Sequence, residues 1–157
     1  LLLSGYCQNS ALVMRDLLET GFLIDYFRTV SGRIMVWRDS TDEERKKSFQ
    51  PRQIRDALDK RDGFTEKKRA DAYKMLANYA AHPTHKGFKL FSPQWMSKIG
   101  PFFDEKYLKA LLEALAQRLP SGADVYVRSF QRVDPRVETT RNGFLGRVSA
   151  WSGKYLR

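Results

Sequence analysis

The chain has 157 residues, 42% of them hydrophobic and 29% charged, which excludes a disordered or fibrous protein and fits one domain with its own core. Its formal net charge of +10 favours polyanionic partners such as nucleic acids, because lysine and arginine displace condensed counterions from phosphates. The single cysteine, Cys7, cannot form an intramolecular disulfide, so we expect a reducing, cytoplasmic location. No apolar run approaches the ~18 residues that cross a bilayer, and the apolar start at Leu1 predicts that the natural protein extends further upstream.

The spacing of apolar residues predicts an all-α fold, a bundle of about five to seven helices in a single domain over residues 1–157. Residues 10–30 carry leucines and aromatic residues at the spacing of a helix that is buried on more than one side. A glycine inside a helix costs about 1 kcal/mol relative to alanine, so Gly21 predicts close approach by another helix. Ser40 or Thr41 is expected to cap the next helix, whose first turn is acidic.

Proline and glycine mark the ends of the two helices that follow. Pro51 is expected in the first turn of one helix, and Gly63 directly after its end. Thr65 is expected to cap the second helix. This helix should stop near His82, because Pro83 disfavours helical backbone at the residue that precedes it.

The second half of the chain begins with a segment of different character. Residues 88–103 alternate in part between apolar and polar side chains and predict a short extended or β-hairpin-like insertion. Asp104 is then expected to cap the most regular helix of the chain, which should end at "LPSG", residues 119–122. Asp134 followed by Pro135 predicts one more helix start.

Two charged residues of the first helix, Arg15 and Glu19, are four positions apart and share one helix face. That helix is mostly apolar, and a buried arginine without a partner costs several kcal/mol. The pair is therefore either a structural ion pair or a polar site inside the bundle.

His82 and His85 are the only histidines, and three interpretations of them are open. His82 fits a helix C-terminal cap, where the helix dipole favours the protonated imidazole. It also fits general acid–base catalysis of RNA cleavage, which requires a nearby cation to hold the phosphate. Metal binding is disfavoured, because Pro83 breaks the helical register and the local run offers no cysteine or carboxylate. We expect no metal and no cofactor.

Arginines recur near the C-terminus and suggest a nucleic-acid-binding surface. Arg128, Arg132 and Arg136 are spaced four residues apart, and Arg141 follows. On one continuous helix the first three would form a ridge of guanidinium groups suited to phosphates. Pro135 would instead kink that helix or divide it into two. A solvated surface without a ligand is the alternative interpretation.

A long helix with "RDLLETGFLIDYF", followed by a later helix that ends "NYAAHPT", resembles the HEPN group of helical domains over residues 4–85. The resemblance is strongest to its uncharacterised bundle branches, in which a helix with Arg-x-x-x-Glu precedes a helix closed by histidine. It implies a helical bundle that forms dimers. It also implies a role in a bacterial defence or toxin system.

The signature of active HEPN ribonucleases is an arginine, a polar residue, three free positions and a histidine. In this chain the matching window is residues 77–82, where Asn78 and His82 fit and Ala77 replaces the arginine. The resemblance therefore implies a degenerate site without ribonuclease activity, unless Arg15 supplies the cation from the neighbouring helix.

Together these observations predict a HEPN-like, non-catalytic module that binds RNA or another protein and forms a homodimer. The first alternative is a metal-independent endoribonuclease, and the second is a purely structural protein-interaction domain. The candidate catalytic residues are His82, Asn78, Arg15 and Glu19, and the candidate nucleic-acid-binding residues are Arg128, Arg132, Arg136 and Arg141.

Overall fold

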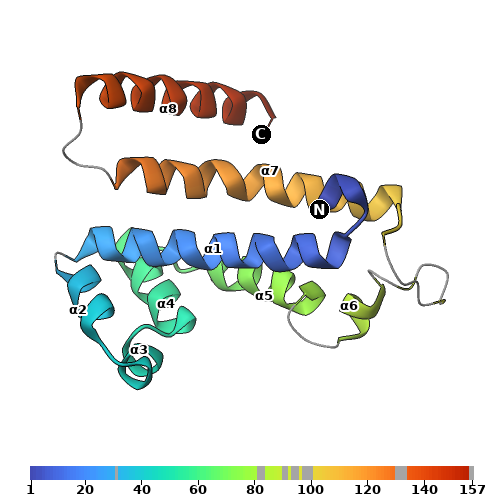
Figure 1. Ribbon diagram of the computed structural model, residues 1–157, viewed down its shortest axis with the longest axis horizontal. Helices are drawn as coiled ribbons and strands as arrows, with labels where there is room; N and C mark the ends of the chain where they lie inside the picture. The colour runs from blue at the N-terminus through green and yellow to red at the C-terminus, as the bar shows by residue number, and fades with distance from the viewer. Residues whose placement is uncertain are drawn as a thin grey trace.

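All regular structure in the described part of the chain is helical. The computed structural model describes residues 1–30, 32–80, 84–89, 92, 96, 101–129 and 134–155. In chain order the helices are the 3-10 helix η1 (Leu2–Ser4), α1 (Cys7–Thr29), α2 (Arg33–Asp39), α3 (Asp42–Ser48), α4 (Pro51–Asp62), α5 (Lys68–Ala80), α6 (His85–Lys89), α7 (Glu105–Arg128) and α8 (Pro135–Tyr155) (Figure 1). No described residue belongs to a strand, so the all-α prediction is confirmed. Within the same residues, no helix is both long enough and apolar enough to cross a bilayer.

Helix α1 lies at the centre of the bundle, with α7 along one side and α4 and α5 along the other (Figure 1). Its most extensive contacts are with α7 and α5. Helices α1 and α7 run parallel, with Gly21 beside Gly122, whereas α5 runs antiparallel to α1 (Figure 1). A central helix with neighbours on opposite sides explains why its apolar residues occupy more than one face.

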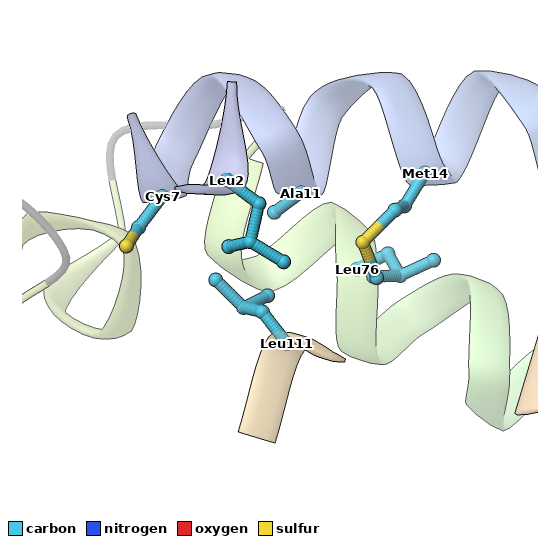
Figure 2. Close-up of a cluster of buried hydrophobic side chains, with 6 residues drawn as sticks. All are labelled: Leu2, Cys7, Ala11, Met14, Leu76 and Leu111. Carbon is cyan, nitrogen blue, oxygen red and sulfur yellow. The ribbon is translucent and has the colours of Figure 1, made fainter. Parts of the chain in front are cut away.

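One apolar cluster holds the N-terminal half of α1 between α5 and α7. Leu76 of α5 is only 1% exposed and lies against Met14 (Figure 2). Leu111 reaches the cluster from α7 and faces Leu2 (Figure 2). Burying one such side chain contributes roughly 2 kcal/mol. The buried members are Leu2, Cys7, Ala11, Met14, Leu76 and Leu111.

An aromatic cluster holds the C-terminal half of α1 against α4. Phe49, Ile54 and Leu58 are its buried members. Two rings of α1, Tyr26 and Phe27, lie edge-to-face on Phe49 with centroid distances of 6.3 and 6.1 Å. Such ring pairs contribute about 1 kcal/mol beyond their burial. The two clusters together anchor α1 along its whole length.

Two glycines mark places where backbones approach closely. A Cβ at Gly21 would lie 3.7 Å from the Cα of Gly122, which confirms the predicted close approach and identifies α7 as the partner. Gly5 has a φ of +80°, and a Cβ there would lie 2.8 Å from the carbonyl oxygen of Phe102. Only glycine fits this position without moving the backbone. The segment before α7 is thereby tied to the start of α1.

Several predicted helix starts and ends are confirmed by their hydrogen bonds. Thr41 forms a capping box at the start of α3. Gly63 ends α4 in the left-handed conformation, with a φ of 68°. The side chain of Asp104 caps α7, and Asp134 accepts a hydrogen bond of 2.8 Å from the backbone N–H of Arg136 at the start of α8.

The predicted end of α7 at residues 119–122 is wrong, because the helix continues to Arg128. Pro120 lies inside it and has no N–H to donate to the preceding turn, a defect that costs about 3 kcal/mol in a helix interior. The continued helix gains tertiary contacts in exchange, since Gly122 packs against α1. Tertiary packing therefore overrides the local stop signal.

Two further predictions about local structure are wrong. Thr65 does not cap α5, which begins at Lys68 and makes its first helical bond to the carbonyl of Lys67. Phe88, predicted in an extended insertion, lies in α6, where the Thr84 hydroxyl accepts a backbone hydrogen bond and starts the helical turn. His85 opens the same helix. The described residues after α6 form no strand, and most of the predicted insertion lies outside the described residues.

Helix α8 runs antiparallel beside α7 at the edge of the bundle (Figure 1). None of its residues is buried. Val137, Trp151 and Tyr155 remain 50%, 36% and 58% exposed. This helix therefore adds little to the core of the single chain.

Candidate functional site

The structure brings Arg15 and Glu19 of α1 together with Arg55 of α4 and Tyr73 of α5. Arg15 Nε lies 3.9 Å from Glu19 Oε1, and Arg15 Nη2 lies 3.0 Å from Asp16 Oδ1. The central carbon of the Arg55 guanidinium lies 4.3 Å from the centroid of the Tyr73 ring, a cation–π contact. We call Arg15, Glu19, Arg55 and Tyr73 the interhelical polar cluster. The prediction that Arg15 and Glu19 form an ion pair in the bundle is confirmed.

Both arginines of the interhelical polar cluster keep N–H groups without a hydrogen-bond partner. Arg55 is 8% exposed, and its Nε and Nη1 atoms are buried and unpaired. Arg15 Nε is also buried without a partner. Leaving a buried donor unpaired costs about 1–3 kcal/mol. The cluster therefore has unused donors, whereas the carboxylates of Glu19 and Asp16 balance the charges of its two arginines.

Tyr73 is kept in its protonated form by its surroundings. Burial raises the pKa of the Tyr73 hydroxyl, and the charge of Glu19 and a hydrogen bond to it raise the pKa further. The charges of Arg15 and Arg55 act in the opposite direction but are the smaller causes. A phenol whose pKa is raised is not a general base near neutral pH. The cluster has donors that can orient a polar group, but it offers no group that is activated to attack one.

The other candidate catalytic residues are not joined to this cluster. Asn78 lies further along α5, and its backbone carbonyl accepts a hydrogen bond from the Thr84 hydroxyl. Among the described residues, no hydrogen bond or ion pair links the Asn78 side chain to Arg15 or Glu19. His82 lies outside the described residues.

Arg128 and Arg136 do not share one continuous helix, which confirms the alternative that two separate helices form there. Arg128 is the last residue of α7, and Arg136 lies in the first turn of α8, because the chain leaves the helix between them. Each described arginine of the set also has an acidic neighbour: Arg128 Nε lies 2.7 Å from Asp124, and Arg141 Nη2 lies 3.2 Å from Glu138. Arg132 lies outside the described residues.

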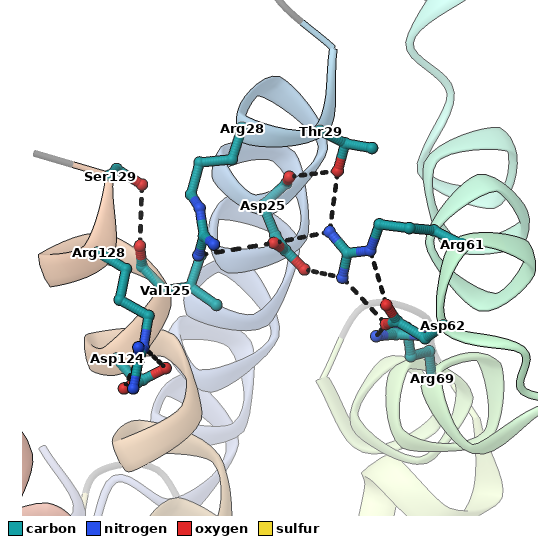
Figure 3. A network of polar contacts seen from close by, with 10 residues as sticks. All are labelled: Asp25, Arg28, Thr29, Arg61, Asp62, Arg69, Asp124, Val125, Arg128 and Ser129. Atoms are coloured by element: carbon teal, nitrogen blue, oxygen red, sulfur yellow. Dashed lines mark hydrogen bonds and ion pairs between the residues drawn. The ribbon is translucent and has the colours of Figure 1, made fainter. Parts of the chain in front are cut away.

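A second polar group surrounds Asp25 and joins α1 to α4 and α5 (Figure 3). The Asp25 carboxylate accepts two hydrogen bonds from Arg61, at 2.9 and 2.8 Å. Arg61 also donates to Asp62, and Arg69 pairs with the same carboxylate. The two guanidinium groups, Arg61 first, lower the pKa of Asp62 to about 2. Bidentate pairs of this kind fix the positions of helices relative to one another.

Next to this network lies an open depression of about 540 Å³ between the C-terminal ends of α1, α4 and α7. Three arginines and two aspartates line it and leave one formal positive charge. Three helix C-termini add about −0.5 each, so the field inside is close to neutral or slightly negative. The depression is therefore a poor phosphate site. Its lining residues are Asp25, Arg28, Thr29, Arg61, Asp124, Val125 and Arg128 (Figure 3 shows all of them).

Uncompensated positive charge lies instead on lysines at the surface. Most described carboxylates are engaged by arginines, whereas Lys68 is the only described lysine in an ion pair with one, that of Glu66. The exposed lysines without an acidic partner are concentrated on α3 to α5 and at the start of α7. They are Lys46, Lys47, Lys60, Lys67, Lys74, Lys106, Lys109 and Lys154.

Arg55 and Tyr73 are not among the site residues predicted from the sequence. The signal for Arg55 was present, because it lies between Ile54 and Leu58 on the apolar face of α4. A charged residue on such a face indicates an internal partner. For Tyr73 the sequence carried no comparable signal, since its place beside Arg55 depends on the crossing of α4 and α5.

No protein-family model, no curated protein and no solved structure matches this chain. The resemblance to HEPN domains therefore stays a prediction that rests on the quoted segments alone.

Proposed function

We propose that this protein is a non-catalytic, HEPN-like RNA-binding module that acts in the cytoplasm. The observation that carries the proposal is the set of exposed lysines without acidic partners on α3, α4, α5 and α7. Because these lysines are not engaged in ion pairs within the described part of the chain, they can neutralise phosphates and release counterions. Counterion release supplies most of the affinity in non-specific RNA binding. The net charge of +10 agrees with such a ligand.

A binding role is favoured over cleavage by the chemistry of the interhelical polar cluster. Tyr73 stays protonated, and Arg15 and Arg55 are cations that hold an anion but do not accept a proton. Ala77 also occupies the arginine position of the ribonuclease signature. Ribonuclease activity through His82 and Asn78 remains the alternative function.

The proposal is tested by the affinity for labelled single-stranded RNA as a function of salt. We expect the slope of log K against log salt to fall by about 2 in the variant Lys60→Glu/Lys67→Glu/Lys74→Glu, since each phosphate contact contributes about 0.7. The matched control Arg128→Glu/Arg136→Glu/Arg141→Glu makes the same change in net charge but reverses arginines that already have acidic neighbours. We expect it to have the smaller effect.

Two results would contradict the proposal. The first is an affinity that does not depend on salt, which would favour a protein-interaction domain. The second is cleavage of the RNA by the purified protein that disappears in His82→Ala, which would favour the ribonuclease alternative.

We also propose that the protein forms a homodimer through α8. The support is that a helix of 21 residues with several aromatic and aliphatic side chains buries none of them in the single chain. A second copy that covers Val137, Trp151 and Tyr155 would supply the missing burial.

A further inference from the structure

A small cleft of about 230 Å³ lies between α1, α2 and α4, separate from the depression at the helix ends. Its walls are mainly apolar and aromatic and include Phe22, Leu23, Trp37, Phe49 and Ile54. Glu19 is the one acidic residue that lines it. Glu19 thus belongs both to the interhelical polar cluster and to an aromatic cleft at the surface.

The aromatic wall of the cleft is held in place by contacts outside it. The Trp37 ring packs on Phe27 with a centroid distance of 5.8 Å, and Phe27 packs on Phe49 at 6.1 Å. Arg45 of α3 donates a hydrogen bond of 3.2 Å to the Trp37 carbonyl, and its guanidinium lies 5.8 Å from the Trp37 ring centroid. Trp37 nevertheless remains 36% exposed. A wall that is preorganised and still accessible loses little entropy on binding a flat ligand.

Glu19 retains the capacity to accept hydrogen bonds from a ligand. An ionised carboxylate offers about four acceptor positions. The 3.9 Å from Glu19 Oε1 to Arg15 Nε is too long for a hydrogen bond. The other neighbour that interacts with the Glu19 carboxylate is Tyr73, whose pKa Glu19 raises. Acceptor positions therefore remain for two adjacent donors in the cleft.

Helix α3, which precedes Phe49 of the cleft, has an acidic first turn and a basic last turn. Helix α3 ends at Ser48 and leads directly to Phe49 in the wall. Lys46 and Lys47 on this helix are exposed, and neither forms an ion pair with a carboxylate of the described residues. An apolar peptide side chain would leave both lysines, and the carboxylate of Glu19, without a matching group.

We propose that this cleft binds one unpaired guanine base of single-stranded RNA, with its ring against Trp37 and its Watson–Crick edge on Glu19. Guanine is the RNA base that presents two neighbouring N–H donors, N1–H and the N2 amino group, which a carboxylate accepts together. Unpaired bases that stack on aromatic side chains are the usual target of sequence-specific RNA recognition. This inference rests on the proposed RNA-binding function and adds a base preference to it.

The test compares a labelled short oligouridylate with the same oligonucleotide carrying one central guanosine, by fluorescence anisotropy on the full chain. We expect the guanosine to raise the affinity about tenfold, as for one bidentate base contact. Trp37→Ala should lower the affinity for the guanosine oligonucleotide about tenfold, since stacking is lost, and Trp37→Phe should restore it. Trp151→Ala is the matched control, because Trp151 is also 36% exposed but lies on α8, and it should bind as the wild type does.

Glu19→Gln separates the base preference from general affinity. This variant should bring the ratio of the two affinities to about one, with its helical circular dichroism unchanged. Equal affinity of the wild type for the two oligonucleotides overturns the guanine site and leaves the proposed RNA-binding function standing. An absence of RNA binding overturns both. Wild-type RNA binding by Trp37→Ala also overturns the guanine site, and it assigns the cleft to a protein partner if an apolar peptide binds the wild type and not this variant.

Discussion

The surroundings of α1 and of α8 differ more than their sequences do. Both are long helices with aromatic and aliphatic residues, yet α1 is anchored by two apolar clusters and by the Asp25 network, whereas α8 buries no side chain. An amphipathic pattern therefore specifies that a segment becomes a helix, but the number of neighbouring elements decides how much that helix stabilises the fold. Changes near α1 should unfold the protein, and equivalent changes on α8 should not.

The largest expected effect is that of Leu76→Ala, which removes a side chain only 1% exposed from the cluster around α1. We expect it to lower the free energy of unfolding by about 3 kcal/mol, through lost burial and a residual cavity. The matched variant Leu145→Ala on α8 removes the same atoms from a partly exposed site and should cost below about 1 kcal/mol. Urea unfolding followed by circular dichroism measures both, and equal losses would show that α8 belongs to the core.

A smaller effect is expected for Asp25→Asn, which weakens the bidentate pair with Arg61 and leaves that guanidinium without its main partner. We expect a loss of about 2 kcal/mol, below the value for a fully buried pair because Arg61 is partly exposed. The control Glu138→Gln breaks the exposed pair with Arg141 on α8 and should change the stability by less than about 0.5 kcal/mol. If Asp25→Asn leaves the free energy of unfolding unchanged, the Asp25 network does not stabilise the position of α1.

The smallest change in stability is expected when the proposed dimer contact on α8 is disrupted. This test also decides whether α8 is covered by a second copy of the chain. If α8 forms the proposed dimer, sedimentation velocity should show the mass of two chains at micromolar concentrations, and the melting temperature should rise with concentration. The variant Val137→Asp/Tyr155→Asp should be monomeric at every concentration with its core unfolding almost unchanged. A wild-type protein that stays monomeric would leave α8 as the weakly held edge of a single bundle.

Local signals in the sequence predicted much of this fold. Thr41, Gly63, Asp104 and Asp134 were assigned to helix ends because each satisfies orphan backbone groups through its own side chain or conformation, which needs no knowledge of the rest of the chain. The helix that passes through Pro120 was not predicted, since its continuation depends on contacts with α1 that have no local signature. The spacing of apolar residues along the sequence does not reveal tertiary contacts of this kind.

The candidate site was predictable to a similar degree. Arg15 and Glu19 were paired from their spacing on one helix, and the structure confirms that pair. Their meeting with Arg55 and Tyr73 depends on how α4 and α5 cross α1, and the spacing within one helix carries no information on such a crossing. Arg128 and Arg136 lie on two different helices, as the alternative interpretation of Pro135 predicted, so no single helix aligns them.

The parallel packing of α1 and α7 has a consequence for the order in which the chain acquires its structure. Helix α1 ends at Thr29 and α7 begins at Glu105, so one flank of the central helix is covered by a segment that a ribosome makes much later. At the usual rate of synthesis this delay is roughly 4 to 15 s. During that time α1, α4 and α5 can assemble, while the groove beside Ala11 and Gly21 stays empty until α7 emerges. The nascent protein thus has a defined interval in which its apolar flank is open to chaperones.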